Sequence, residues 1–228
     1  MNPIALTLRT PRFVLAAVLL TLMALPASDL RALSQPDGTI IPVGAGLQDL
    51  FNGRGEAIDV LADARTVPET FVPSCALTFE VLQRNAGYMN NFGWYNVTGA
   101  PPLEAELHEV LACTDGVGTV RTVDIRNDPA YLGGEVAFFE GVNNCAAAGS
   151  YLYVFYSEPA YNPDSSAANP YVHLLIYDST VVPRAFYFGW EDLSSGGDND
   201  FDDLTTFVTG ITCSGGGGPC DGLPNERV

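Results

Sequence analysis

Short runs of aromatic and branched side chains are the feature that most limits how this chain can fold. Clear examples are ALTFEV at 76–81, YLYVFY at 151–156, YVHLLIYD at 171–178 and RAFYFGW at 184–190. Runs of this length and composition are typical of β-strands, and the Gly, Pro, Asn and Asp between them are typical of turns. We therefore predict eight or nine strands between Ala76 and Thr212, forming an antiparallel β-sandwich or jelly-roll-like domain. A parallel α/β fold is not expected, because no long helical pattern alternates with the runs.

The residues before this domain follow a different pattern. Leu47, Leu50 and Phe51 recur at helical spacing before Gly53 and Gly55 interrupt them, which predicts a short helical or irregular segment. The expected organisation is a signal peptide at 1–27, an N-terminal segment at 28–75 packing on the main domain, the β-sandwich at 76–213 and a Gly-rich flexible tail at 214–228.

The first residues resemble a signal for export. Arg9 and Arg12 precede an apolar run at 13–25, which is too short to cross a bilayer as an ordinary helix. Small residues follow, so we expect cleavage after Ala27 or Ser28; the alternative is an uncleaved anchor. The prediction is an exported protein, either periplasmic, at the cell surface or secreted, with no membrane span after cleavage.

The chain is strongly acidic, with 27 Asp and Glu against 10 basic residues and a formal charge of −17. A surface of this charge repels nucleic acids and anionic lipids and attracts cations. We therefore expect no nucleic-acid partner. All ten basic residues are arginine, which is typical of a GC-rich and hence bacterial genome.

Five cysteines follow the export signal: Cys75, Cys113, Cys145, Cys213 and Cys220. Disulfides persist in exported proteins, and no C-x-x-C spacing is present to indicate zinc. We expect the pairs Cys113–Cys145 and Cys213–Cys220, although the spacing alone does not determine connectivity. Cys75 would be the odd one.

The segment GWEDLSSGGDNDFDDL at 189–204 concentrates acidic residues without a single basic one. It holds Glu191, Asp192, Asp198, Asp200, Asp202 and Asp203. Two carboxylates about 4 Å apart repel by roughly 4 kcal/mol near a protein surface. Folding these residues into one turn therefore requires dispersal into water, raised pKa values or a bound cation.

Oxygen ligands at alternate positions, with no His or Cys, favour a hard ion and calcium ahead of magnesium. The predicted ligands are Glu191, Asp192, Asp198, Asp200 and Asp203. An EF-hand is excluded, because Asp203 stands where that loop needs Gly and Thr209 stands where it needs Glu. The alternative is a solvated acidic loop without an ion.

FGWEDLSSGGDNDFDDL, together with RNAGYMNNFGWYN at 84–96, resembles an uncharacterised domain of secreted bacterial proteins, the domain of unknown function 4114. The resemblance extends over roughly 76–211. It implies an all-β extracellular module for which calcium is suspected, and the matching positions are those of the five predicted ligands. Asp202 departs from the pattern, since the family more often has Asn or another polar residue there. The resemblance implies no particular reaction.

Catalysis has weaker support in the sequence. Glu191 and Asp192 are adjacent, so in a strand they would point to opposite faces, which does not suit the paired carboxylates of a glycosidase. Glu135, Glu140 or Glu158 would have to supply a partner. His173 is expected to lie on a strand face, as either a packed or a surface residue rather than a base, and no G-x-S-x-G motif is present.

Aromatic residues near turns are candidates for stacking against a ligand, as in lectin-like modules. They are Trp94, Tyr95, Tyr156 and Tyr161, although most aromatics of a sandwich fill its core. We therefore expect a non-catalytic surface or extracellular module with a structural calcium site, serving adhesion, ligand binding or envelope structure. The alternative is a carbohydrate-active protein, either a glycan-binding module or a polysaccharide hydrolase. The partner is not identified, and a glycan or a cell-surface protein would fit.

Overall fold

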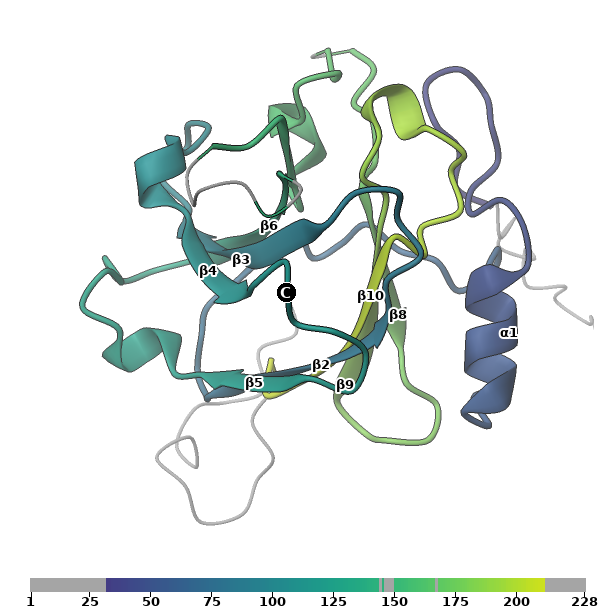
Figure 1. The fold of residues 1–228 in the computed structure, drawn as a ribbon, viewed down its shortest axis with the longest axis horizontal. Helices are drawn as coiled ribbons and strands as arrows, with labels where there is room; N and C mark the ends of the chain where they lie inside the picture. Colours follow the sequence, from purple (N-terminus) through teal and green to yellow (C-terminus); the bar gives the residue numbers. More distant parts are fainter. Residues whose placement is uncertain (1–31, 144, 146–149, 167, 212–228) are drawn as a thin grey trace, which may run out of the picture. The chain divides into compact units, whose positions relative to one another are not determined.

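The computed structural model describes residues 32–143, 145, 150–166 and 168–211 (Figure 1). The predicted signal peptide and tail, with Cys213 and Cys220, lie outside these ranges. The described residues belong to one compact unit that begins at Arg31. None of their helices is long and apolar enough to span a membrane.

The unit is all-β, as predicted, with two antiparallel sheets of five strands each. In the first sheet, β1 (Thr70–Phe71), β6 (Val136–Val142), β3 (Asn90–Asn96) and β4 (His108–Leu111) follow one another, and β7 (Tyr153–Tyr156) also pairs with β6. In the second, the order is β5 (Val120–Val123), β2 (Leu77–Gln83), β10 (Leu204–Thr209), β9 (Ala185–Trp190) and β8 (Leu174–Asp178). The helical elements are α1 (Gly46–Gly53) and four short 3-10 turns, η1 (Glu104–Glu106), η2 (Ile125–Asn127), η3 (Pro159–Tyr161) and η4 (Ser194–Gly196).

The main core lies between the two sheets and is dominated by aromatic rings. Phe138 of β6 contacts Phe92 of its own sheet and Phe79 and Phe188 of the opposite sheet, at centroid distances of 5.3–5.7 Å. Trp190 is fully buried in the same cluster. These rings occupy alternate positions on their strands, as the pleat requires for one face of a sandwich.

A third layer covers the outer face of the second sheet. Leu47 and Phe51 of α1 form a buried cluster with Tyr177 and Tyr187, and Figure 1 shows α1 beside β8 and β10. Phe51 meets both tyrosine rings at about 5 Å. Strands covered on both faces read as nearly continuous apolar runs, which explains the sequence of β8 and β9.

The strand predicted at 171–178 starts later than the sequence indicates. The 171–178 run enters its strand only at Leu174, because the backbone N–H groups of Tyr171 and Val172 donate to side-chain oxygens of Ser165 and Gln35. The described residues from Ala76 onward form nine strands, β2 to β10, which confirms the predicted number. The additional short strand β1 precedes Ala76 and pairs with the start of β6.

The predicted disulfide Cys113–Cys145 is confirmed, with the two Cα atoms 5.5 Å apart. Cys75 is also disulfide-bonded, so the expectation that it is the odd cysteine is wrong.

Glu56 ties the N-terminal layer to the β8–β9 turn. Its carboxylate accepts hydrogen bonds from the Ser179 and Tyr187 hydroxyls and from Thr180, through both its N–H and its hydroxyl. Burial opposes the charge, but these hydrogen bonds outweigh it and lower the pKa of Glu56 to about 2. The carboxylate therefore stabilises the fold only while ionised.

We expect Glu56→Gln to destabilise the protein by about 2 kcal/mol at pH 7, because charge-assisted hydrogen bonds are replaced by weaker or unmatched ones. The folded pKa lies below the ordinary value of 4.5, so this stabilisation is present above pH 4.5 and is lost as the pH falls toward 2. Urea unfolding at pH 7 and pH 3 measures both effects. Glu135→Gln, an exposed position, is the control; equal losses in the two variants would contradict the assignment.

Candidate metal centre

The acidic segment is the connection between β9 and β10. These strands pair from Ala185↔Thr209 to Trp190↔Leu204. Glu191 and Asp203 each lie one residue beyond that last pair, so they are cross-strand neighbours at the end of the hairpin. The local sequence produces this arrangement, because Trp190 and Leu204 are core residues that fix the register of both strand ends.

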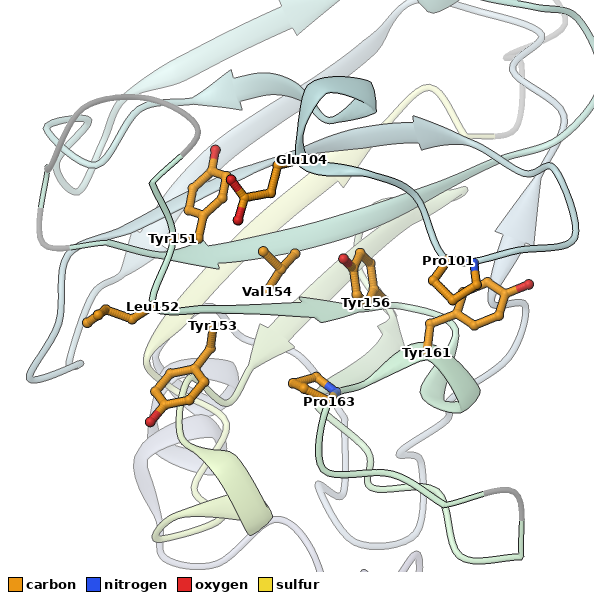
Figure 2. A pocket seen from close by; sticks show the side chains of 9 residues that line it. All are labelled: Pro101, Glu104, Tyr151, Leu152, Tyr153, Val154, Tyr156, Tyr161 and Pro163. Atoms are coloured by element: carbon orange, nitrogen blue, oxygen red, sulfur yellow. The ribbon is translucent and has the colours of Figure 1, made fainter.

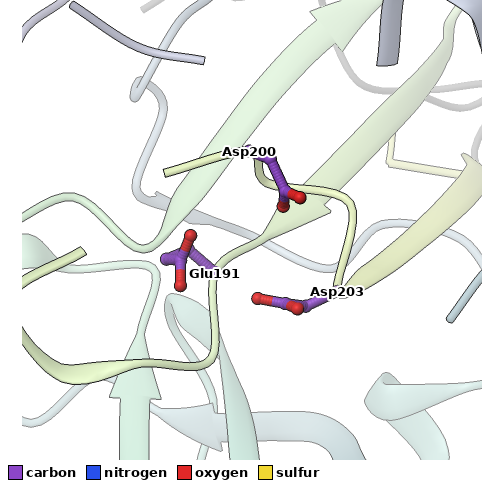
Figure 3. Close-up of side chains that lie close together, drawn as sticks. All are labelled: Glu191, Asp200 and Asp203. Atoms are coloured by element: carbon purple, nitrogen blue, oxygen red, sulfur yellow. The ribbon is translucent and has the colours of Figure 1, made fainter. Parts of the chain in front are cut away.

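Three carboxylates converge there: Glu191, Asp200 and Asp203 each offer an oxygen atom, and these atoms lie within 4.8 Å of one another. Figure 3 shows the three side chains directed toward a common space, one from each end of the hairpin and one from the connecting loop. Glu191 is fully buried, and its Oε2 has no hydrogen-bond partner among the described residues. A buried carboxylate oxygen without a partner is costly, which makes Glu191 Oε2 a candidate ligand for a cation.

The electrostatics of the cluster agree with that geometry. Burial, followed by the charge of Asp203, raises the pKa of Glu191 to about 9. Burial and the charge of Asp192 raise the pKa of Asp203 to about 8. Burial also raises the pKa of Asp200. Without a cation, the three carboxylates cannot all be ionised at neutral pH without mutual repulsion.

A second layer of polar groups lies behind the cluster, on strand β3 and strand β6. Asn90 donates from Nδ2 to Glu140 Oε1 at 3.1 Å and to Asp192 Oδ2 at 2.9 Å. Glu140 is fully buried, and its pKa is raised well above the ordinary value by burial and by the nearby Asp192 and Asp203. The Arg84 guanidinium donates to three backbone carbonyls beside this layer, including that of Asn90.

The loop backbone is shaped to pass close to the carboxylates. Ser195, Asn199 and Phe201 all have positive φ, near 60°, although none is glycine. Phe201 is buried and Asn199 Oδ1 accepts a hydrogen bond from Gln35, so packing and hydrogen bonding hold the loop in this shape. At Gly197, which also has positive φ, a Cβ would lie 2.6 Å from Glu191 Oε1. Only glycine therefore fits beside the carboxylate.

The structure brings together three of the five predicted ligands and separates the other two. Asp192 points into the second polar layer, where Asn90 binds its carboxylate, while its backbone N–H donates to Asp203. Asp198 is exposed to solvent. Asp202 also points elsewhere: its Oδ2 lies against Gly46 at the start of α1.

A buried His–Asp pair, which was not predicted, anchors the same loop. His173 bonds through Nδ1 to the Glu191 carbonyl at 2.7 Å and through Nε2 to Asp164 Oδ2 at 2.9 Å. Asp164 also accepts a hydrogen bond from the Ser195 N–H. Of the two alternatives expected for His173, the packed residue agrees with its full burial and with its stacking on Phe155 at 3.7 Å. Its partner was not predicted, since Asp164 lies in an irregular loop.

Two of the four candidate stacking residues are not available to a ligand. Trp94 and Tyr95 are buried on opposite faces of β3, because each face of that strand is covered by an apolar cluster. Tyr156 and Tyr161 instead border a surface hollow.

Fold and site together define an all-β sandwich protein with a carboxylate cluster at the end of its β9–β10 hairpin. Residues 133–210 match the family model of a domain of unknown function, DUF4114, which supports the resemblance to that family over this part of the chain. The match covers β6 to β10 and the whole acidic segment, so it confirms that part of the resemblance predicted from the sequence; residues 84–96 lie outside it. No curated protein and no solved structure matches the chain.

Proposed function

We propose that this chain is a non-catalytic β-sandwich module, exported to the cell surface or secreted, whose β9–β10 loop is held by a structural calcium ion. Its role would be adhesion, ligand binding or envelope structure. The observation that carries the proposal is the convergence of Glu191, Asp200 and Asp203 around a buried, unpartnered Glu191 oxygen. Export is supported by the basic residues and apolar run at 9–25.

The donor set favours calcium over other ions. All three groups are carboxylates, the ligands that hard cations prefer, and no histidine or cysteine takes part. Two oxygens on opposite sides of a calcium ion lie up to ~5 Å apart, against ~4 Å for magnesium. The 4.8 Å limit on the separations here is compatible with the larger ion. Carbonyls and water would complete the coordination.

Burial argues against a catalytic use of these carboxylates. Glu191 is fully buried, and Asp203 is only 8% exposed. A polysaccharide could not place a glycosidic bond between them without the loop opening. Asp200, which is partly exposed, offers a small ion a route from solvent while excluding a sugar ring.

The test is thermal unfolding of the full chain in excess calcium, in magnesium and in EDTA. Calcium at 100 times its Kd should stabilise the native state by about 2.7 kcal/mol, which corresponds to a rise in Tm of roughly 5–10 °C for a domain of this size. Magnesium should give a smaller rise. Asp200→Asn and Asp203→Asn should each remove most of the calcium effect.

Asp198→Asn is the matched control, because Asp198 belongs to the same loop but is exposed and lies outside the convergent group. It should retain most of the stabilisation by calcium. A Tm that is the same in calcium and EDTA would contradict the proposal and leave the cluster as a set of protonated carboxyl groups.

A further inference from the structure

A shallow hollow on the outer side of the first sheet shares no residue with the carboxylate cluster. Its volume is about 280 Å³, just below the ~300 Å³ at which ordinary small-molecule sites begin. The residues that line it come from strand β7, from η3 and from the segment around η1. They include Tyr151, Tyr153, Tyr156, Tyr161, Pro101 and Glu104.

Two of the tyrosine rings that line this hollow are held in place by packing. The Tyr151 ring lies directly on Gly141 of β6, where any side chain would collide with it. Tyr156 packs edge-to-face against the buried Tyr95 at a centroid distance of 5.5 Å. A ligand that stacks on rings already fixed by packing loses little of its binding energy to ordering them.

The rings form an extended row rather than a cage. Figure 2 shows Tyr151 with Glu104 at one end, Tyr156 and Tyr161 with Pro101 at the other, and Val154 between them. A compact quaternary ammonium ion needs aromatic faces around one centre. The extended row of tyrosine rings instead fits a ligand that is itself a chain of linked rings carrying hydroxyl groups.

The charge of the site further restricts the chemical class of ligand that it can bind. Among the lining residues, Glu104 is charged and none is basic, and the chain as a whole carries a formal charge of −17. An anionic polymer would be repelled. Tyrosine hydroxyls and a carboxylate pair well with sugar hydroxyls, while the ring faces cover the apolar face of a sugar.

We propose that this hollow binds a neutral oligosaccharide, with Tyr151 and Tyr161 as the stacking platform and Glu104 accepting hydroxyl hydrogen bonds. The proposal supplies a ligand class for the binding role proposed above. Of the predicted stacking residues, Tyr161 belongs to the platform, whereas Tyr156 is buried beneath it. Tyr151 was not predicted, because its neighbour Gly141 is close only through the β6–β7 pairing.

The experiment measures binding of the full chain, in calcium buffer, to immobilised neutral hexasaccharides: cellohexaose, laminarihexaose, xylohexaose and mannohexaose. Polygalacturonate and choline are the anionic and cationic probes. At least one neutral hexasaccharide should bind, and Tyr161→Ala should weaken that binding by about tenfold or more. Tyr161→Phe, which keeps the ring, should lose less, and Glu104→Gln should weaken binding several-fold.

Leu132→Ala is the control, since Leu132 is the most exposed large apolar side chain described and does not line the hollow. It should leave binding unchanged. Three results would each overturn the proposal. In the first, no neutral sugar is retained; in the second, Tyr161→Ala leaves the retention unchanged; in the third, choline or polygalacturonate binds in place of neutral sugars. The Tm of each variant in calcium and EDTA is read in parallel, so sugar binding without a calcium effect, or the reverse, separates the two proposals.

Discussion

In EDTA, the protein is expected to lose stability steadily as the pH rises from about 4 to about 9. The pKa values of Glu191 and Asp203 in the folded state are about 9 and about 8, against ordinary values of 4.5 and 3.8. Folding therefore keeps protons on these groups that the unfolded chain releases. Their contribution is fully present below pH 4 and is lost as the pH rises through the folded pKa values. The expected loss is several kcal/mol.

Calcium should reverse this dependence above neutral pH, because the ion binds the ionised carboxylates and competes with protons. The measurement is urea unfolding from pH 5 to pH 9, with and without calcium. The two curves should lie close together at pH 5 and separate progressively toward pH 9. Parallel curves across the whole range would show that the cluster does not bind the ion.

The Glu191→Gln substitution tests the same prediction, because its effect on the free energy of unfolding should have opposite signs with and without calcium. In EDTA at pH 8 the variant should be more stable than the wild type by about 1–3 kcal/mol, since folding of the wild type must keep a proton on Glu191 that the unfolded chain releases at this pH, and Gln carries no such cost. In excess calcium it should be the less stable protein, since it has lost a ligand. A variant that is less stable in both conditions would mean that Glu191 acts mainly through its hydrogen bond from Leu193.

The predicted strand at 184–190 accounts for one member of the cluster, because Glu191 directly follows its last residue. The pairing of β9 with β10, which places Asp203 beside Glu191, was not predicted. The strand pattern also argues against Asp192 as a ligand in the same cluster. Successive residues of an extended chain point to opposite sides, so Asp192 points away from the side on which Glu191 joins the cluster.

The remaining part of the site depends on contacts that no local pattern encodes. Asn90 reaches Asp192 from 102 residues away and Glu140 from 50 residues away. Trp94 and Tyr95 illustrate the same limit in the core. Alternation predicts that one of two neighbours is exposed, but β3 has an apolar cluster on each face, so both are buried. The packing of the whole fold, and not the local sequence, decides which strands are covered on both faces.

Substitutions in the His173–Asp164 pair should cause the second large loss of stability. Nδ1 of His173 faces the Glu191 carbonyl and Nε2 faces a carboxylate oxygen, so both nitrogens have acceptors as partners. The ring therefore contacts the acidic loop on one side and is the buried partner of the Asp164 carboxylate on the other. His173→Ala would leave the Asp164 carboxylate uncompensated and should cost about 3–5 kcal/mol in urea unfolding.

A double-mutant cycle distinguishes this pair from ordinary packing. Asp164→Ala alone should also be strongly destabilising, because it leaves His173 Nε2 and the Ser195 N–H without their partner. The double variant should cost clearly less than the sum of the two single variants, since neither buried polar group then remains without its partner. If the costs simply add, the pair is not coupled.

Because both residues hold the loop that carries Glu191, His173→Ala should also weaken calcium binding. The core substitution Phe188→Ala should lower stability, but the fraction that stays folded should retain its calcium affinity. Equal losses of calcium affinity in the two variants would show that the pair contributes general stability and does not position the metal-binding loop.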